Sequence, residues 1–597
     1  MYIYNKMIKK FFSNVLGSFV GAWLALVVFS FMAVMMGFAL IGSMAGDGSS
    51  SDNVVQEKSV LHLNLMGGFD ERVNSKEAIK SALLGNGEET ATSLETILKA
   101  LRIAKDNENI KGVFIECKGN SAGLATLFEI RKALQDFKKS GKFVYAYGNE
   151  GIAQSDYYLA SVADSILLNP VGLVDIHGLS STIPFFKNLL DKLGVEMQIL
   201  RVGTFKSAVE PYVETQASPA NRMATETYMK SIWGNLCDSI ANSRSISTEK
   251  LNELASSLMM TQKGEYFVSN KIVDGLKYRF EVIDMLKSKT EIGANNDLRL
   301  VTPEQVAALD IEKVHADKVA VVYAVGEIDG TSEGGVVSST LVKDIIEIAN
   351  DDAVKAVVLR VNSPGGSAFG SEQIWAALEE VKKKGKPFAV SMGDLAASGG
   401  YYISCGADRI FAEPVTLTGS IGIFGMVPCI KGLMNDKLGV TLSVINTNEN
   451  GNFISLTEPM TPVQREAMQR MINEGYELFT SRCATGRGME LDSLKMIAEG
   501  RVWDGITAKK LGLVDEFGDL NNAIDWVVEK AKVGEYSVAV YPKEDTSFMS
   551  YLRGYVKMGV DKVMETKTGE LYKYRDAVND IINRDHIQCL MEPVVIK

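Results

Sequence analysis

The sequence has few cysteines and histidines, and neither residue type forms a recognisable cluster. Among 597 residues there are six cysteines and four histidines, with no C-x-x-C pair and no H-E-x-x-H motif. A structural zinc site or a disulfide scaffold needs such spacings. We therefore predict buried thiols, no metal ion and no other cofactor.

Runs of basic residues are also missing. Lys and Arg number 63 against 74 Asp and Glu, which gives a net charge of -11 and a pI near 5.3. Binding to phosphates needs a basic surface, so we predict that the protein binds no nucleic acid. The composition is that of a globular protein, and the length predicts at least two domains.

There is one long hydrophobic run and no second. Lys6, Lys9 and Lys10 precede an uncharged stretch over residues 11–46. A membrane span needs about 20 apolar residues, whereas the apolar part of a secretory signal has about 7–15. We predict a transmembrane anchor at 11–46 with residues 1–10 in the cytoplasm, because positive charge stays inside. Cleavage after Ser43-Met44-Ala45 is the alternative.

The rest of the chain repeats itself. The strand-like run at 110–116 matches the run at 354–360, 244 residues later, and Asp191-Lys-Leu-Gly-Val195 matches Asp436-Lys-Leu-Gly-Val440, 245 residues later. A nearly constant offset indicates two homologous halves. We place them at 55–310 and 316–540, followed by a tail at 545–597 whose role is not readable. Alternating strands and helices in each half predict an α/β fold with parallel sheets.

Two glycines distinguish the second half. Asn362-Ser-Pro-Gly365-Gly366-Ser367 follows its strand, where the first half has Lys118-Gly-Asn-Ser-Ala-Gly123. Adjacent glycines allow backbone N–H groups to point together at an anion, as an oxyanion hole requires. A tight strand-to-helix turn is the alternative.

A serine follows the next strand, which we predict at 387–392. Ser398 stands between Ala396-Ala397 and Gly399-Gly400, and these small neighbours leave room for a substrate carbonyl. The position resembles a nucleophile elbow, although G-x-S-x-G is absent. A serine at a helix N-cap is the alternative. The first half has Gln154 there, which cannot be a nucleophile.

A lysine distinguishes the first half. Lys206 lies in Arg201-Val-Gly-Thr-Phe-Lys206-Ser-Ala-Val-Glu-Pro211, and the repeat places Ile454 opposite it. A single lysine is usually a solvated surface residue. One half therefore carries the lysine without the serine, and the other the serine without the lysine. This complementary loss favours a shared site. Ser247-Thr-Glu-Lys250 also matches S-x-x-K, but we interpret Ser247 as a helix N-cap.

Together with Thr418-Gly-Ser420-Ile-Gly-Ile-Phe-Gly425, these motifs resemble the signal peptide peptidase A (protease IV) family in its long form. The resemblance implies two tandem ClpP/crotonase-like domains and a homotetramer on the membrane. It implies a Ser/Lys dyad in which Ser398 is the nucleophile and Lys206 the general base. Expected substrates are signal peptides and other apolar or unfolded peptides.

The mechanism that this resemblance implies assigns roles to further residues. Lys206 would be kept neutral by burial and would take the Ser398 proton. Gly365 and Gly366 would hold the oxyanion, and Ser420 would orient the lysine or be an ordinary turn serine. The expected location is the cytoplasmic (inner) membrane, crossed once, with both halves on the outer, periplasmic side. A crotonase-like acyl-thioester enzyme and a non-catalytic membrane scaffold are the alternatives.

Overall fold

The computed structural model describes residues 55–72, 92–310, 314–329, 335–543 and 586–592. The predicted anchor at 11–46, the segment before it and most of the tail lie outside these ranges. Within them, no helix is both long and apolar enough to cross a membrane. The chain divides into two compact units, Met1–Glu57 and Lys58–Lys597, and the second is described below.

The first half is built on a parallel sheet of six strands. Its central strand is a run of buried, largely apolar residues, as expected for a sheet covered on both faces. The order across the sheet is β8 (Gly275–Leu276), β5 (Ser165–Leu168), β3 (Phe143–Gly148), β2 (Ile110–Asn120), β1 (Ser59–Gly67) and β9 (Leu300–Val301).

The second half repeats this order. Its strands run β18 (Glu516–Phe517), β14 (Arg409–Ala412), β13 (Phe388–Ala397), β11 (Val354–Ser363), β10 (Lys318–Val325) and β19 (Ser537–Tyr541). These pairs are all parallel, and β15 (Leu417–Gly419) and β17 (Val502–Asp504) extend the sheet beyond the end of β13. The predicted α/β class with parallel sheets is confirmed. The strand predicted at 387–392 is longer and reaches Ala397.

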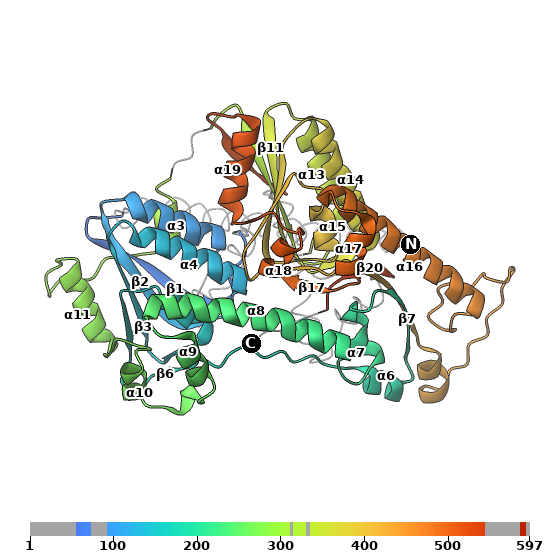
Figure 1. The fold of residues 1–597 in the computed structure, drawn as a ribbon, viewed down its shortest axis with the longest axis horizontal. Coiled ribbons are helices and arrows are strands. Elements are labelled where there is room, and N and C mark those ends of the chain that lie inside the picture. Colours follow the sequence, from blue (N-terminus) through green and yellow to red (C-terminus); the bar gives the residue numbers. More distant parts are fainter. Residues whose placement is uncertain (1–54, 73–91, 311–313, 330–334, 544–585, 593–597) are drawn as a thin grey trace, which may run out of the picture. The chain divides into compact units, whose positions relative to one another are not determined.

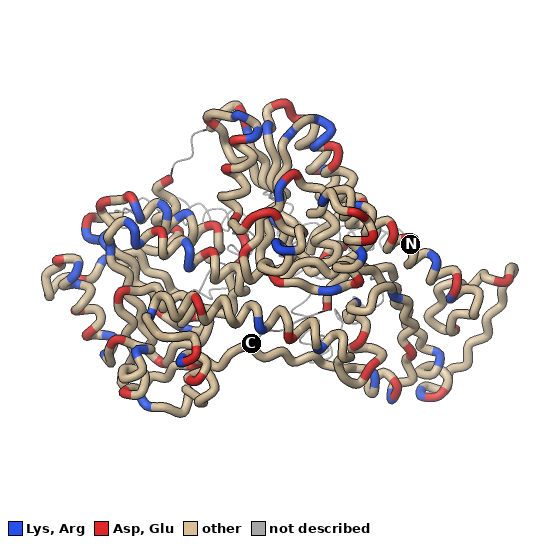
Figure 2. The backbone as a smooth tube through the Cα atoms, viewed as in Figure 1, with Lys and Arg blue, Asp and Glu red and all other residues tan. Residues whose placement is uncertain are grey.

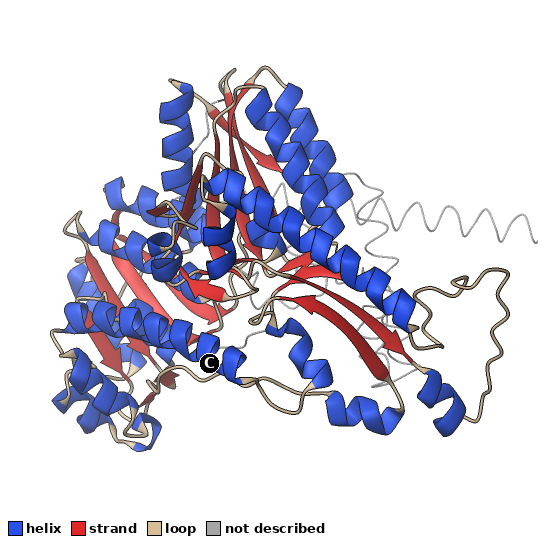
Figure 3. Ribbon diagram, turned by 45° about the vertical axis from the view of Figure 1, so that its right-hand side comes forward, coloured by secondary structure: helices blue, strands red, loops and turns tan. Residues whose placement is uncertain are grey.

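Helices cover the sheets, as Figures 1 and 3 show. Two long helices occupy matching places in the halves, and each begins with an N-cap hydroxyl followed by proline. The helices of the first half are α3 (Leu94–Asp106), α4 (Leu124–Lys138), α5 (Gln154–Ala160), α6 (Lys187–Leu193), α7 (Glu210–Val213), α8 (Pro219–Arg244), α9 (Thr248–Ala255), α10 (Gly264–Ser269), α11 (Arg279–Lys289) and α12 (Pro303–Ala307). Those of the second are α13 (Ser338–Asn350), α14 (Ala368–Lys383), α15 (Gly399–Ser404), α16 (Pro462–Arg487), α17 (Leu491–Ile497), α18 (Gly505–Lys510) and α19 (Leu520–Ala531).

A third sheet joins distant parts of the chain. Its order is β12 (Gly365–Ser367), β20 (Ile587–Leu590), β16 (Ile423–Cys429) and β7 (Glu196–Val202). All three pairings are antiparallel. The strand β7 comes from the first half, β12 and β16 from the second, and β20 from the end of the chain. The first two sheets thus hold each half together, and the third connects the halves. A fourth sheet pairs β4 (Gly151–Ile152) with β6 (Leu173–Val174).

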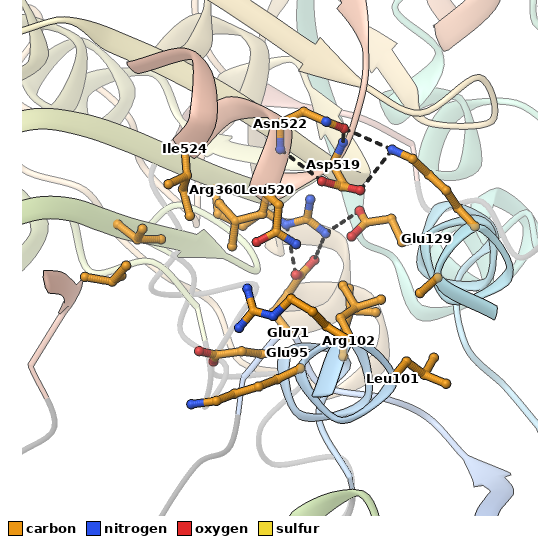
Figure 4. Close-up of a pocket in the computed structure, with 18 of the residues that line it drawn as sticks. Glu71, Glu95, Leu101, Arg102, Glu129, Arg360, Asp519, Leu520, Asn522 and Ile524 are labelled. Carbon is orange, nitrogen blue, oxygen red and sulfur yellow. Dashed lines mark hydrogen bonds and ion pairs between the residues drawn. The ribbon is translucent and has the colours of Figure 1, made fainter. Parts of the chain in front are cut away.

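A buried ion-pair network also connects the halves. The Arg360 guanidinium in β11 donates to Glu71 Oε2 at 2.9 Å and to Glu129 Oε1 at 2.8 Å (Figure 4). These side chains line a cavity of about 370 Å³. The pKa of Glu129 is raised to about 8, because the effect of burial is larger than the opposing effect of the Arg360 charge. Glu129 is therefore harder to ionise than a solvated carboxyl group.

Acidic and basic residues are intermixed along the described chain and do not separate into regions of one sign (Figure 2). All six cysteines are buried thiols, as the sequence predicts. In the part of the chain that the structure describes, no three His, Cys, Asp or Glu side chains gather where they could hold a metal ion.

Candidate active site

Lys206 is carried into the second half by the strand β7. The chain leaves β7 at Val202, and Lys206 precedes a short 3₁₀ helix, Ser207–Val209. The lysine side chain is 1% exposed. Gly500 lies so close that a Cβ on it would stand 2.7 Å from Cα and Cβ of Lys206, so only glycine fits there. The surrounding backbone therefore excludes water from the lysine stem.

Ser398 occupies a strained turn between β13 and α15. Its φ of 56° and ψ of -114° are unusual for a residue with a side chain. The Ser398 N–H donates to the Gly419 carbonyl at 2.8 Å, and its own carbonyl accepts from the Tyr402 N–H at 2.8 Å. Its hydroxyl makes no cap hydrogen bond to α15. The Ser398 hydroxyl therefore does not cap the helix, unlike the alternative considered from the sequence. The strained backbone of Ser398 resembles that of a nucleophile elbow.

The two side chains meet although they are 192 residues apart in sequence. The Lys206 Nζ to Ser398 Oγ distance is 2.6 Å. Lys206 Nζ also donates to the Ser420 carbonyl and to Ser420 Oγ, both at 3.1 Å. A neutral amine has two N–H donors and one lone pair. In the neutral form, two N–H groups suffice for both Ser420 oxygens, and the lone pair is then available to the Ser398 hydroxyl.

Burial changes the acidity of this lysine. It lowers the pKa of Lys206 to about 7, from the usual value of 10.5. About half of the lysine is then neutral at pH 7, compared with well under 0.1% for a solvated lysine. Burial thus converts an ordinary ammonium into a group that can accept a proton.

Backbone N–H groups gather beside the serine. Gly365 and Gly366 have φ values of 103° and 149°, and a Cβ on Gly366 would meet the Ile328 carbonyl oxygen at 2.1 Å. They lie in β12 rather than in a simple turn. The Gly365 N–H donates to Ser363 Oγ at 3.2 Å, so it is already engaged. The Gly399 N–H begins α15 and has no acceptor inside that helix.

The matching place in the first half is filled differently. The Gln154 side-chain amide donates to the Gly178 carbonyl at 2.9 Å, and its oxygen accepts from the N–H groups of His177 and Gly178. An amide locked onto backbone cannot attack a substrate. Ile454, which the repeat places opposite Lys206, lies in an irregular, partly exposed segment. Outside the site, Ser247 Oγ accepts from the Lys250 N–H at 3.1 Å, which confirms the predicted N-cap.

Two features of the site escaped the sequence reasoning. The Gly399 N–H stands next to Gly365, and its position directly after the serine was the available signal. The strand β20, from the tail, lies between β12 and β16. Its alternation of Ile587, Cys589 and Met591 was the only hint of a strand.

Comparison with known proteins agrees with this geometry. The family model of Peptidase family S49 matches residues 136–293 and 380–534. Protease 4 of Salmonella typhi is 35% identical over 574 residues, covering 92% of this chain and 88% of that protein. Protease 4 of Haemophilus influenzae is 34% identical over 558 residues, covering 89% and 90%. The chloroplastic serine protease SPPA of Arabidopsis thaliana is 27% identical over 539 residues, covering 87% and 76%. A strained serine, a buried lysine and a sequence alike over almost its whole length show that the chain belongs to Peptidase family S49, as a serine protease of that family.

Proposed function

We propose that the chain is a membrane-anchored endopeptidase that cuts peptide bonds with a Ser398/Lys206 dyad. The observation that carries this proposal is the 2.6 Å contact between Lys206 Nζ and Ser398 Oγ. A serine hydroxyl needs an adjacent base, and a lysine can be one only when its ammonium is destabilised. Burial provides that condition by lowering the pKa of Lys206 to about 7. Ser420 holds the amine through its carbonyl and hydroxyl.

The proposed reaction has two steps. Ser398 Oγ attacks the substrate carbonyl while its proton moves to Lys206 Nζ, and the lysine then gives this proton to the leaving amine. Water hydrolyses the resulting ester and restores Ser398. The N–H groups of Gly366 and Gly399 would hold the oxyanion, each contributing about 3–4 kcal/mol. Gly365 shapes this site through its positive φ, because its own N–H bonds Ser363 Oγ.

The substrate class and location rest on the family resemblance and on the sequence. Signal peptides and other apolar peptides are the proposed substrates. The run at 11–46 would anchor the chain in the cytoplasmic membrane, with both halves on the outer side. The ClpP/crotonase-like relationship of the two halves also stays a prediction. Membership in a peptidase family favours a protease over the acyl-thioester enzyme and over the non-catalytic scaffold.

The internal repeat supports the proposed homotetramer. Within the chain, β7 of the first half pairs with β16 of the second. The repeat of β7 is the segment 441–447, which is exposed and carries Ile445 at 92% exposure. The repeat of β16 is the segment 179–185 of the first half. Pairing 441–447 of one chain with 179–185 of the next would continue the same contact and close a ring. We expect Ile445→Asp to dissociate the assembly, as measured by light scattering.

The dyad is tested by substitution. Ser398→Ala and Lys206→Ala should each abolish hydrolysis of an apolar model peptide and leave the circular dichroism spectrum unchanged. Ser247→Ala provides a matched control, because Ser247 belongs to the other Ser/Lys motif. This substitution removes only a helix N-cap hydrogen bond, so hydrolysis should persist. Turnover retained in either dyad variant, or labelling of another residue by a serine-directed fluorophosphonate, would refute the dyad. Binding of coenzyme A esters would favour the acyl-thioester alternative.

A further inference from the structure

The strand β13 contains a bulge shortly before Ser398. Its neighbour β11 loses register with it at Asn362, which alone faces residues 393–395 of β13. Before the bulge β13 pairs with β14, and beyond it with β15. The strand β15 ends one residue before Ser420, which holds Lys206. Bulges beside active sites commonly redirect a strand. This bulge therefore brings the serine strand beside the strand that leads to Ser420.

The side chain of Asn362 bridges the bulge. Its Oδ1 accepts a hydrogen bond from the Leu395 N–H at 3.1 Å. A backbone N–H that loses its strand partner at a bulge needs another acceptor, and the asparagine amide provides one. Asn362 also lies three residues before Gly365, at the end of β11. One side chain thus links the strand that leads to Ser398 with the segment that leads to the glycine pair.

Glu71 of the first half fixes the orientation of this amide. Glu71 Oε1 accepts from Asn362 Nδ2 at 2.9 Å, and Glu71 Oε2 accepts from Arg360 Nε at 2.9 Å; Figure 4 shows the contact with Arg360. A Cβ on Gly393 would stand 2.6 Å from Glu71 Oε1, so glycine in the bulge leaves room for the carboxylate. Because this carboxylate oxygen accepts, the amide turns its NH₂ group toward Glu71 and its oxygen toward Leu395.

The bulge is tied to the first half by a second contact. Asp394 Oδ1 accepts from the N–H groups of Ala125 and Thr126 at 2.7 and 3.0 Å, in the first turn of α4. A carboxylate stabilises a helix N-terminus in this way. The cap residue of α4, Gly123, has no side chain, and a Cβ on it would overlap the Asp394 carboxylate. The first half therefore holds both Asp394 and, through Glu71, the side chain that bridges the bulge.

The first half itself shows the same place without the amide. Lys118 stands there, exposed, with its Nζ 3.9 Å from Glu116 Oε2. The strand that corresponds to β13 is divided into β3 and β4, which belong to separate sheets. It leads to Gln154, whose amide is bound to backbone. The bridged bulge and the serine thus occur together, in the half that carries the nucleophile.

We propose that Asn362 is a positioning residue for this serine protease, which sets the place of Ser398 and is itself held by Glu71. This inference rests on the proposed dyad. The first half then contributes to the site twice, because it supplies Lys206 and also orients the amide that supports the serine strand. A misplacement of about 1 Å at a reacting group can cost about 100-fold in rate. The amide bonds the backbone and neighbouring carboxylates, so its loss should lower kcat more than it raises KM.

Replacement of the amide by leucine tests this role. Asn362→Leu keeps a branched side chain and removes its hydrogen bonds, so kcat for an apolar model peptide should fall about 100-fold while KM changes less than about threefold. The rate of Ser398 labelling by a fluorophosphonate should fall with kcat. Asn350→Leu is the matched control and should keep the wild-type rate, because the Asn350 amide donates to the Ile346 carbonyl of its own helix.

The outcomes of this experiment separate the two proposals. An unchanged kcat in Asn362→Leu, or a rise in KM alone, would overturn the positioning role and leave the dyad standing. A wild-type chain that neither hydrolyses the peptide nor reacts with the fluorophosphonate at Ser398 would overturn the proposed function.

An exchange of the pair tests the contact with Glu71. Asn362→Asp keeps an acceptor for the Leu395 N–H but places a second carboxylate beside Glu71, so kcat should fall at least about tenfold. Adding Glu71→Gln supplies an amide that donates to the new carboxylate and keeps an oxygen for Arg360. The double variant should therefore be at least about fivefold faster than Asn362→Asp, a recovery that a general loss of stability would not give. A double variant no faster than Asn362→Asp would overturn the inference.

Discussion

The pH dependence of serine acylation tests the lysine most directly. With the pKa of Lys206 at about 7, about 9% of the lysine is neutral at pH 6 and about 91% at pH 8. The rate of Ser398 labelling by a fluorophosphonate should therefore rise about tenfold from pH 5 to pH 6 and level off above pH 8. A solvated lysine would give a rise continuing to about pH 10. Observation of that later rise would refute the role of burial.

Two substitutions at Lys206 separate its charge from its packing. Lys206→Arg stays charged at every accessible pH and should be inactive throughout, because arginine cannot accept the serine proton. Folding lowers the pKa of Lys206, so this residue makes the wild-type protein less stable as the pH falls from 10.5 toward 7. Lys206→Met removes this effect. Lys206→Met should therefore gain up to about 4 kcal/mol at pH 7 and about 2 kcal/mol at pH 9, measured by urea unfolding. An equal difference at both pH values would contradict the lowered pKa.

Three more predictions concern the surroundings of the dyad. Gly366→Ala should lower kcat at least about 100-fold, because its Cβ would meet the Ile328 carbonyl at 2.1 Å and displace an oxyanion donor; Gly385→Ala, also at positive φ but with no atom within 4 Å, is the control and should stay active. Ser420→Ala removes one acceptor of the ammonium and should shift the inflection of the pH–rate profile below its wild-type value; an unchanged inflection would show that the hydroxyl does not bond the lysine. Burial raises the pKa of Glu129 to about 8, so this residue makes the wild-type protein less stable as the pH rises from 4.5 to 8. In urea unfolding, Glu129→Gln should therefore become more stable relative to the wild type as the pH rises from 5 to 8. A constant difference between the two proteins would argue against this titration.

The sequence by itself determined the features that depend on local pattern. Buried strands such as β2 and β11 are short apolar runs, and the offset between them revealed the repeat. The repeat then acted as an internal control, since positions needed only for folding should match between the halves. Ser398 and Lys206 each stand in one half alone, which singled them out without any structure.

Only the tertiary structure decided whether those residues meet. Their 2.6 Å contact spans 192 residues and depends on the pairing of β7 with β16, a long-range contact that no local pattern encodes. The lowered pKa of Lys206 depends on burial by segments such as Gly500, far along the chain. The place of β20 beside Gly366 also follows from backbone hydrogen bonding, which specifies almost nothing about side chains. Local residue patterns thus identified the reactive groups, and long-range packing set their distances, their protonation and the strand that covers them.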